Sequence, residues 1–501
     1  MKKYILVSAL IFNLFTPFML DAKAAATPKF SVVALTKPPQ QILANQIVSA
    51  QYNVTNNTKI TRTFTLIPVA GITQQPGANI CPIPFTLAQG QSCRFNLQLN
   101  AAQLGAGVHS GPVICKTKSA NDNTPDSLLC SNPSNSDSLN VTVIPCTSST
   151  CLNSQKAQQL RAVTARYEQQ YHIPGLLAGI WIPGQGELII QDGVADIETG
   201  RPITITDHVR IASITKSFTT TVVLQLVQDG LVNINNPISS LGFSIQNNNA
   251  TIGQLADMRS GIFNYSVDAN FLQGLDSNVL RKWQPQELVN FANSNNVYFA
   301  PGANWHYSNT NTILLGMIIE QLTGHFIGDE INNRIITPLG LTETSYSTSP
   351  TLPAPFSRGY IGGSLEDITD VDPSFSGAAG GMISTVGDLK KWAHALATGS
   401  VLSPAMQAQR VSSILPMSFD PCADNDPSRP HPTCPEYDQY GYGLGSIEGW
   451  RGHTGDYLGY QLLMMYEPTS GATIVIMVNI SGVGIHVPTN LFREYLTVLN
   501  S

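Results

Sequence analysis

The chain has 501 residues, of which only 12% are charged, and its formal net charge is −6. Typical soluble domains carry about 25% charged residues, and surfaces that bind nucleic acid or an anionic membrane need clustered Lys and Arg. The composition therefore argues against both kinds of partner. At about 150 residues per domain the length allows three units, and the patterns below favour fewer.

The N-terminal 24 residues have the pattern of a secretory signal peptide. Lys2 and Lys3 precede an apolar stretch that Asn13 and Pro17 interrupt, and small residues follow. This run is shorter than the roughly 20 residues that cross a bilayer, so we expect cleavage rather than a transmembrane anchor. No cysteine here supports a lipid anchor, and no later stretch is long and apolar enough to span. We expect a soluble protein that is periplasmic or secreted.

The cysteines form an even set, as expected in a compartment that permits disulfides. Their spacing favours pairing in sequence order, although eight cysteines allow about 105 connectivities. A zinc site is the competing interpretation, but the chain has no CxxC pair and its one "HPTC" stretch stands alone, so we expect no metal. The cysteines are Cys81, Cys93, Cys115, Cys130, Cys146, Cys151, Cys422 and Cys434.

Residues 27–145 alternate apolar and polar side chains in short runs such as "KFSVVAL", "QIVSAQYNVTNNT" and "SCRFNLQLN". This period of two, with Gly, Pro and Asn turns between runs, predicts a small all-β sandwich of immunoglobulin-like size. We find no paired carboxylates, no serine with a base and no ligand cluster in it. A spacer or stabilising module is favoured, and contact with a surface or protein partner is the alternative.

Residues 146–154 form a polar linker, and residues 155–501 have a different texture. Strand patterns lie near both ends of this region, and helical patterns fill the middle. We therefore predict an α+β domain, with helices flanking an antiparallel sheet and a helical lobe. The patterns are a helix after the linker, a hairpin at 176–200, helices over 217–340, a hairpin at 459–480 and a helix at 487–500.

The stretch "VRIASITKSFTTTVVLQLVQDG" places Ser213 three residues before Lys216 at the start of an apolar helical run. Positions i and i+3 share a helix face, so the lysine can activate the hydroxyl, and N–H groups at the helix start can hold an oxyanion. An ordinary serine and lysine on a helix is the alternative. Lys216 is the only lysine in the chain with serine three positions before it.

The stretch "PGANWHYSNTNTILLG" contains Tyr307 and Asn309. A phenol beside an ammonium is favoured as phenolate, so Tyr307 near Lys216 would act as a general base. Asn309 would hold the lysine or a substrate amide. The alternative is a helix-capping loop whose tyrosine only packs.

The stretch "WRGHTGDYLGYQ" contains His453, Thr454 and Gly455 at the edge of a strand pattern. Gly455 would let a substrate lie close against the backbone. The N–H of Asp456 would pair with that of Ser213 as the two donors of an oxyanion hole. A turn that enters a strand is the alternative.

Together, in this order, these motifs make the region from about 155 to 501 resemble the serine β-lactamase-like hydrolases, in the branch of class C β-lactamases, D-alanyl-D-alanine carboxypeptidases and related esterases. The stretches "TIGQLADMRSGIFNYS", "GAAGGMISTVGDLKKWAHAL" and "YGYGLG" carry the same resemblance. It implies a site between sheet and helical lobe, with no metal and no organic cofactor. The implied roles are Ser213 as nucleophile, Lys216 and Tyr307 in proton transfer, Asn309 in substrate positioning, and His453, Thr454 and Gly455 on the strand that lines the cleft.

One departure from the family pattern bears on the substrate. Class C β-lactamases usually carry lysine where His453 stands, and a permanent cation suits the carboxylate of a penicillin. Histidine, with an ordinary pKa of about 6.5, is largely neutral near pH 7. This resembles the carboxypeptidases and esterases of the branch. Arg451 is a candidate for the missing charge, and we expect the side chain of Asp456 to point to solvent.

These observations predict an exported serine hydrolase that acts through an acyl-enzyme on Ser213. A D-alanyl-D-alanine-type carboxypeptidase or D-amino peptidase is favoured, and a carboxylesterase or class C-like β-lactamase is the alternative, so the substrate is a small peptide, ester or β-lactam. A non-catalytic secreted binding protein on the same scaffold is less favoured. No GxSxG motif supports an α/β-hydrolase. The Pro-rich stretch 419–439, pinned by Cys422 and Cys434, either shapes the cleft rim or is a plain surface loop.

Overall fold

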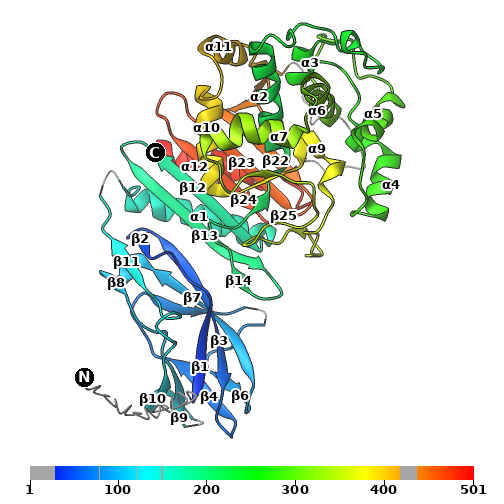
Figure 1. Cartoon of the computed structure of the whole chain (residues 1–501). Helices are drawn as coiled ribbons and strands as arrows, with labels where there is room; N and C mark the ends of the chain where they lie inside the picture. Colours follow the sequence, from blue (N-terminus) through cyan, green and yellow to red (C-terminus); the bar gives the residue numbers. More distant parts are fainter. Residues whose placement is uncertain (1–28, 78, 120, 148–149, 418–436) are drawn as a thin grey trace, which may run out of the picture.

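The computed structural model describes residues 29–77, 79–119, 121–147, 150–417 and 437–501. The predicted signal peptide and the Cys422–Cys434 pair lie outside these residues. Figure 1 shows an N-terminal all-β part beside a larger part of mixed helices and strands. The predicted α+β class with a small all-β region in front of it is confirmed.

Two four-stranded sheets, in the orders β1-β3-β7-β5 and β10-β9-β4-β6, make up most of the N-terminal part. The alternation seen in the sequence gives each strand one buried face: in β3, Val48, Tyr52 and Val54 are buried. Phe30 of one sheet packs on Phe64 of the other, with ring centroids 4.5 Å apart, so the sheets share a core. The strands are β1 Phe30–Thr36, β2 Gln41–Leu43, β3 Ile47–Asn56, β4 Arg62–Leu66, β5 Ile72–Gln75, β6 Phe85–Leu87, β7 Ser92–Asn100, β8 Gly107–Val108, β9 Ile114–Ser119, β10 Asp122–Ser131 and β11 Val141–Ile144.

The predicted order of disulfide pairing is confirmed for the described cysteines. Bridges join Cys81 to Cys93, Cys115 to Cys130 and Cys146 to Cys151. The second bridge links register partners on β9 and β10, and the third closes the linker.

A nine-stranded antiparallel sheet, in the order β14-β13-β12-β24-β23-β22-β21-β20-β19, is the centre of the C-terminal part. Successive residues of a strand face opposite sides, and both sides of this sheet are buried. Leu176 of β12 packs with helices α1 and α12, and its neighbour Leu177 packs in the other core with α2 and α10. The strands therefore read as nearly continuous apolar runs rather than as alternating ones.

Helices between the two strand clusters form the predicted helical lobe (Figure 1). Among the described residues, no helix is long and apolar enough to cross a membrane. The elements are α1 Ser154–Tyr171, β12 Gly175–Ile182, β13 Gly186–Asp196, β14 Arg201–Pro202, β15 Val209–Arg210, α2 Thr215–Gln228, α3 Ile252–Ala256, α4 Ala269–Ser277, α5 Pro285–Asn293, α6 Asn309–Thr323, α7 Ile327–Ile331, α8 Thr337–Leu339, β16 Ser345–Tyr346, β17 Tyr360–Ile361, α9 Gly377–Gly380, β18 Met382–Ser384, α10 Val386–Thr398, α11 Pro404–Ser412, β19 Leu415–Pro416, β20 Gln439–Gly441, β21 Leu444–Ile447, β22 Trp450–Tyr457, β23 Tyr460–Tyr466, β24 Thr473–Val478, β25 Ile480–Ser481 and α12 Val487–Asn500.

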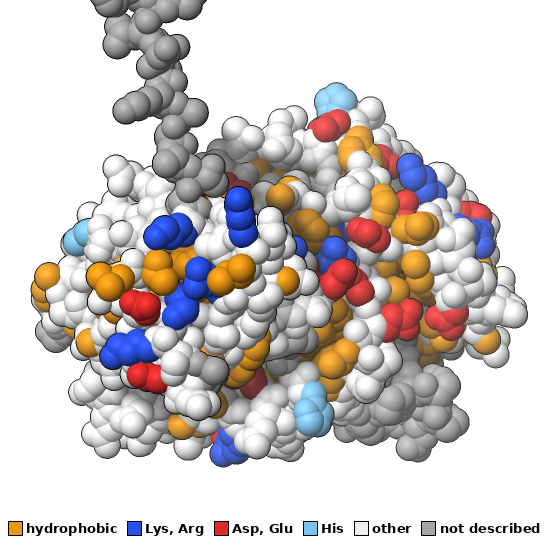
Figure 2. Space-filling model, turned by 90° about the horizontal axis from the view of Figure 1, so that it is seen from below, with side chains coloured by type: hydrophobic (Ala, Val, Ile, Leu, Met, Phe, Trp, Pro, Cys, Tyr) orange, Lys and Arg blue, Asp and Glu red, His pale blue; other side chains and the backbone are white. Residues whose placement is uncertain are grey.

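Side-chain amides join the two parts of the molecule. Gln51 and Asn96 of the N-terminal part donate to the carbonyl oxygens of Thr199 and Gly200, at 3.0 and 2.6 Å. Asn45 and Asn79 make similar bonds to Glu187 O and Glu198 O, and Arg161 donates to Asn45 O. None of the ion pairs found among the described residues crosses this boundary. Figure 2 shows hydrophobic side chains and charges of both signs spread over one face of the molecule.

Candidate active site

Ser213 lies in a single 3-10 turn, η2 (Ala212–Ile214), directly before helix α2. Ala212 has φ +51°, a left-handed conformation that is uncommon for a residue with a Cβ atom and that tends to occur at functional sites. Helix α2 itself is buried from Thr215 to Leu226. The chain therefore turns sharply just before a core helix begins, and this turn leaves the Ser213 side chain partly exposed.

Lys216 contacts Ser213 as the sequence predicts. Its Nζ atom lies 2.8 Å from Ser213 Oγ and donates at 2.8 Å to the carbonyl oxygen of Ala379. Lys216 is 1% exposed, and burial holds the pKa of its amine well below the usual 10.5. A lowered pKa favours the neutral form of the amine, and it is this form that can accept the Ser213 proton.

Tyr307 lies beside the same lysine. The Lys216 Nζ atom is 4.9 Å from the centroid of the Tyr307 ring. The ring also packs against Trp305 and Tyr440, with centroids 6.4 and 6.3 Å away. Because Trp305 and Tyr440 are fully buried, Tyr307 has a fixed place at the edge of the core, next to the serine and lysine.

Asn309 is the first residue of α6. The sequence predicted that it would hold either Lys216 or a substrate amide, and the contact with Lys216 is not found. Its side-chain amide donates to Ser266 Oγ at 2.9 Å, and its backbone N–H donates to Asn264 Oδ1 at 3.0 Å. Asn309 therefore binds the turn around η4 (Tyr265–Val267) rather than Lys216. Its side chain still faces the same cavity as Ser213.

His453 lies on β22 but does not line the cavity, contrary to the expectation from sequence. It is 0% exposed, and its ring nitrogens Nδ1 and Nε2 lie 2.9 Å from the hydroxyls of Tyr437 and Tyr440. Nδ1 is also 2.6 Å from Thr454 O, which can only accept, so Nδ1 carries the hydrogen and Nε2 accepts from Tyr440. Burial lowers the pKa of His453 to about 3, so the ring is neutral. Arg451 does not line the cavity either.

Glycine is needed at position 455 because a side chain there would collide with the chain itself. A Cβ atom at Gly455 would lie 2.7 Å from Ile211 O and 2.9 Å from Ala212 Cβ. The chain around η2 therefore approaches Gly455 closely enough to require glycine there. The same position is 3.4 Å from Ser213 N, so β22 brings its backbone next to the Ser213 N–H. This adjacency is what an oxyanion hole from Ser213 and Asp456 requires.

Asp456 is partly exposed and is one of the residues that line the cavity. Its Oδ2 atom accepts from Gln461 Nε2 at 3.2 Å. Thr454 lines the cavity as well, and its N–H donates to the Tyr437 hydroxyl at 2.7 Å. The predicted strand thus contributes Thr454 and Asp456 to the cavity, whereas His453 and Gly455 hold the strand in place.

The cavity at Ser213 has a volume of about 380 Å³ and two chemically different sides. Among the residues that the structure describes, no Lys or Arg lines it, and Asp456 is its one carboxylate. His486 also lines it, and burial lowers the pKa of that imidazole to about 4, so His486 is neutral. The polar side is formed by Ser213, Asn264, Ser266, Tyr307, Asn309 and Thr454, and the apolar side by Phe271, Leu272, Leu275, Ile361, Phe375 and Leu458.

Several residues that build the site had no role assigned from the sequence. They are the ones that position other groups: Ala379 for Lys216, Asn264 and Ser266 for Asn309, and Tyr437 and Tyr440 for His453. All but Tyr437 fall within the stretches that carried the family resemblance, "RSGIFNYS", "GAAGG" and "YGYGLG". The resemblance in those stretches was the sequence signal that could have indicated these positioning residues.

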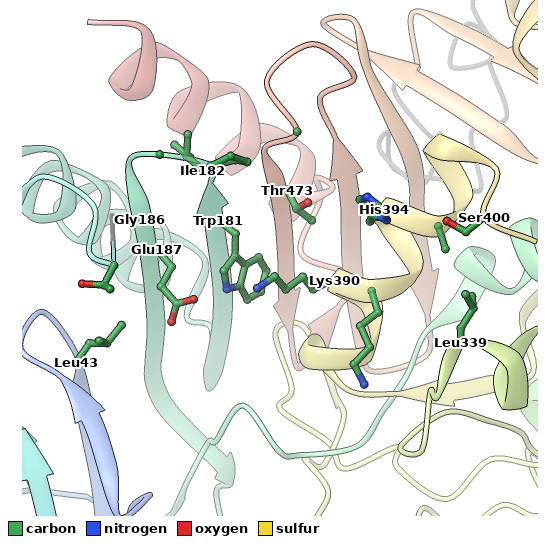
Figure 3. A pocket seen from close by; sticks show the side chains of 16 residues that line it. Leu43, Trp181, Ile182, Gly186, Glu187, Leu339, Lys390, His394, Ser400 and Thr473 are labelled. Atoms are coloured by element: carbon green, nitrogen blue, oxygen red, sulfur yellow. The ribbon is translucent and has the colours of Figure 1, made fainter. Parts of the chain in front are cut away.

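A separate cavity of about 770 Å³ lies between the N-terminal part, the β12–β13 hairpin and α10. Figure 3 shows Trp181 beside Lys390, whose Nζ atom is 4.5 Å from the indole ring. Glu187 and His394 also line this cavity, but none of the residues singled out from the sequence does. Within the described ranges, no cluster of three His, Cys, Asp or Glu side chains could hold a metal ion. The cavity at Ser213 is therefore the candidate active site.

The C-terminal part of the chain matches known proteins. The family model described as Beta-lactamase matches residues 160–491. Protein flp of Staphylococcus aureus is 29% identical over 203 residues, which cover 39% of this chain and 39% of that protein, so the match spans about two fifths of that relative. Penicillin-binding protein 4 of Amycolatopsis lactamdurans is 24% identical over 346 residues, 65% of this chain and 86% of that protein.

Two solved structures resemble the C-terminal part. A D-stereospecific amidohydrolase from Streptomyces sp. is 28% identical with a TM-score of 0.56, and the match covers 66% of this chain and 97% of that one. D-amino acid amidase from Ochrobactrum anthropi, complexed with L-phenylalanine, is 26% identical with a TM-score of 0.58 and coverage of 68% and 98%.

Proposed function

Because the chain belongs to the Beta-lactamase family of serine hydrolases, we propose that Ser213 attacks an amide or ester carbonyl and forms an acyl-enzyme. The observation that carries this proposal is the 2.8 Å contact between Ser213 Oγ and the buried amine of Lys216. A serine hydroxyl becomes a good nucleophile only when a base removes its proton, and a lysine with a lowered pKa is such a base at neutral pH.

Lys216 takes the proton of Ser213 as the bond from Oγ to the carbonyl carbon forms. Tyr307 gives its hydroxyl proton to the leaving amine or alcohol as that bond breaks, and Lys216 returns the proton of Ser213 to Tyr307. The N–H groups of Ser213 and Asp456 hold the oxyanion. Water then attacks the acyl carbon as Lys216 takes a proton from the water; the bond from that carbon to Ser213 Oγ breaks, Lys216 returns the proton to Ser213, and the acid product leaves.

We propose a D-amino peptidase or D-amino acid amidase as the first choice of activity. Asp456 gives the cavity a negative charge that favours a substrate ammonium, and no described cation lines the cavity to bind a substrate carboxylate. The apolar side with Phe271 and Leu275 suits a hydrophobic substrate side chain. Amidases that act on D-amino acids are among the structural relatives, which supports the same choice.

A D-alanyl-D-alanine-type carboxypeptidase is the second candidate. Its support is the match to a penicillin-binding protein over 65% of the chain, because such proteins are named for the acyl-enzyme that penicillin leaves on them. The lack of a described cation in the cavity argues against it. Esterase activity follows from the same chemistry, since an ester is a more reactive acyl donor than an amide.

We also propose that the protein works outside the cytoplasm, in the periplasm or after secretion. Its three disulfides among the described residues need an oxidising compartment to form and persist.

The experiment compares turnover of D-phenylalaninamide, its L-enantiomer, a D-alanyl-D-alanine peptide and p-nitrophenyl acetate, with Ser213→Ala as the matched control. Benzylpenicillin is tested in parallel by intact mass of the protein. We expect hydrolysis of the D-amide above that of the L-amide, lost in the variant. Faster turnover of the D-alanyl-D-alanine peptide with a stable penicillin adduct would favour the second candidate. Equal turnover by Ser213→Ala on every substrate would overturn the serine mechanism.

A further inference from the structure

A second, smaller pocket lies in the helical lobe and shares no lining residue with the cavity at Ser213. This rear pocket has a volume of about 250 Å³ and lies between α5, α6, α7, β16 and α9. Its walls are mostly apolar, from Leu288, Ile313, Met317, Phe326 and Ala378. The size fits a molecule of about one substituted ring and is too small for a folded partner or a peptide segment.

Polar groups at the rear pocket lack protein partners. Trp283 is 2% exposed, and its indole N–H has no acceptor among the described residues. The Tyr346 hydroxyl lines the pocket, makes no hydrogen bond to a described residue, and stays protonated because burial raises its pKa. Glu320 adds a carboxylate, of which Oε1 accepts from Ile327 N at 3.1 Å. The Trp283 N–H is enclosed by the protein, so the Tyr346 hydroxyl is the donor that a ligand in the pocket can use.

The rear pocket touches the active site by two routes. Trp283 packs on Phe271 with ring centroids 5.1 Å apart, and Phe271 lines the cavity at Ser213. The second route is α9, a helix of four residues whose Gly377 and Ala378 line the rear pocket. On its other side, Ala379 O accepts the hydrogen bond from Lys216 Nζ.

Packing around α9 is tight, so a ligand that enters the rear pocket would displace this helix. A Cβ atom at Gly316 of α6 would lie only 2.6 Å from Ala378 Cβ. Ala378 O also accepts from Thr219 of α2, at 2.7 Å. Close-packed interiors transmit small displacements, and a shift of α9 moves the carbonyl that orients the catalytic lysine.

We propose that the rear pocket binds a small, mainly apolar molecule with a carbonyl or similar hydrogen-bond acceptor, and that its occupancy changes the rate of acylation by moving α9 and Lys216. The acceptor would bind the Tyr346 hydroxyl, and the apolar part would pack on Trp283, Leu288 and Met317. This goes beyond the proposed hydrolase activity, and the binding step does not depend on it.

The binding test uses acetophenone, a ketone that offers an acceptor and a ring but no bond to hydrolyse. Leu288→Trp fills the pocket, and Leu280→Trp, at a site that is 52% exposed, is the matched control. Saturable binding is measured by ligand-observed NMR on the full chain, and melting temperatures check that both variants fold. We expect equal binding to the natural chain and Leu280→Trp, and at least a tenfold loss in Leu288→Trp. No saturable binding to the natural chain, or equal binding to both variants, overturns the proposal.

The kinetic test uses whichever substrate the enzyme turns over. We expect acetophenone to change kcat at least twofold with little change in KM, and to have no such effect on Leu288→Trp. A purely competitive pattern would place the ketone in the cavity at Ser213 and overturn the regulatory step. Since binding is measured without turnover, a failure of the hydrolase proposal and a failure of this one give different results.

Discussion

The side-chain nitrogen of Lys216 lies 2.8 Å from Ser213 Oγ and 2.8 Å from the carbonyl oxygen of Ala379, to which it donates. A buried lysine without such a partner would be free to rotate among orientations that miss the hydroxyl. Two residues 163 positions apart thus define the base of the reaction.

Lys216→Met should abolish most turnover while the fold is retained. Methionine has a similar length and suits a buried site but has no basic nitrogen. Since general-base contributions are typically about 10²–10⁴, we expect a loss of that size in kcat. Lys216→Arg should not rescue activity, because a guanidinium stays protonated. Single-turnover kinetics with an ester substrate check both variants. Full activity in Lys216→Met would return the base role to Tyr307.

The pH dependence of kcat/KM should follow the titration of Lys216 and not that of His453. Activity needs the neutral amine, so kcat/KM should rise with pH through the lowered pKa of Lys216 and fall as that amine is protonated. His453 titrates near pH 3, well below this limb. His453→Gln should therefore leave the limb in place even if the rate falls. A limb near pH 6.5 that disappears in His453→Gln would contradict the buried, neutral state of that imidazole.

Tyr437→Phe should destabilise the protein more than Tyr440→Phe. The Tyr437 hydroxyl contacts His453 Nδ1, Thr454 Oγ1 and Thr454 N, whereas that of Tyr440 contacts only His453 among the hydrogen bonds found in the described residues. Leaving buried groups unsatisfied costs about 1–3 kcal/mol, so we expect values toward the upper end for Tyr437 and the lower end for Tyr440. Urea denaturation measures the difference. The reverse order would show that the Tyr437 contacts are not maintained in solution.

Gly455→Ala should damage the site because its new methyl group meets Ile211 O at 2.7 Å. The strand or the turn must shift, and a shift of about 1 Å at a reacting group can cost around a hundredfold in rate. Gly387→Ala in α10 is the control, since there the nearest heavy atom is 3.9 Å away. Turnover and melting temperature of the two variants are compared. Similar rates would show that the tight contact between β22 and the turn at Ser213 does not matter for catalysis.

Asp456→Asn should change substrate preference. It keeps the backbone N–H but removes the negative charge from the cavity wall. A hydrogen bond to a charged group contributes about 1.5–3 kcal/mol, so the ratio of kcat/KM for D-phenylalaninamide to that for its N-acetyl derivative should fall roughly tenfold or more. The ratio cancels any effect on the oxyanion donor that both substrates share. An unchanged ratio would assign amine recognition, if any, to other groups.

Local pattern predicted much of this molecule. Strand alternation indicated the all-β part, helical spacing indicated α1 and α12, and the Ser213–Lys216 pair meets as its spacing of three residues requires. Long-range contacts were beyond the same reasoning. Nothing near Lys216 in the sequence names Ala379, and nothing near His453 indicates that two tyrosine hydroxyls hold its ring.

Burial also decided which way side chains point. In a strand with both faces covered, alternation does not tell which face meets the cavity. The His453 side chain was therefore expected in the cavity, which it does not line, and the side chain of Asp456 was expected in solvent. The lowered pKa of Lys216 likewise comes from burial by elements distant in sequence, which the local pattern around Lys216 does not indicate.

The bonds between the two parts of the molecule join mostly neutral amides to backbone carbonyls, so changes in ionic strength have little to weaken there. If the far end of the N-terminal part were held on a surface, these bonds would keep the catalytic part attached beside it at high salt as well as at low salt.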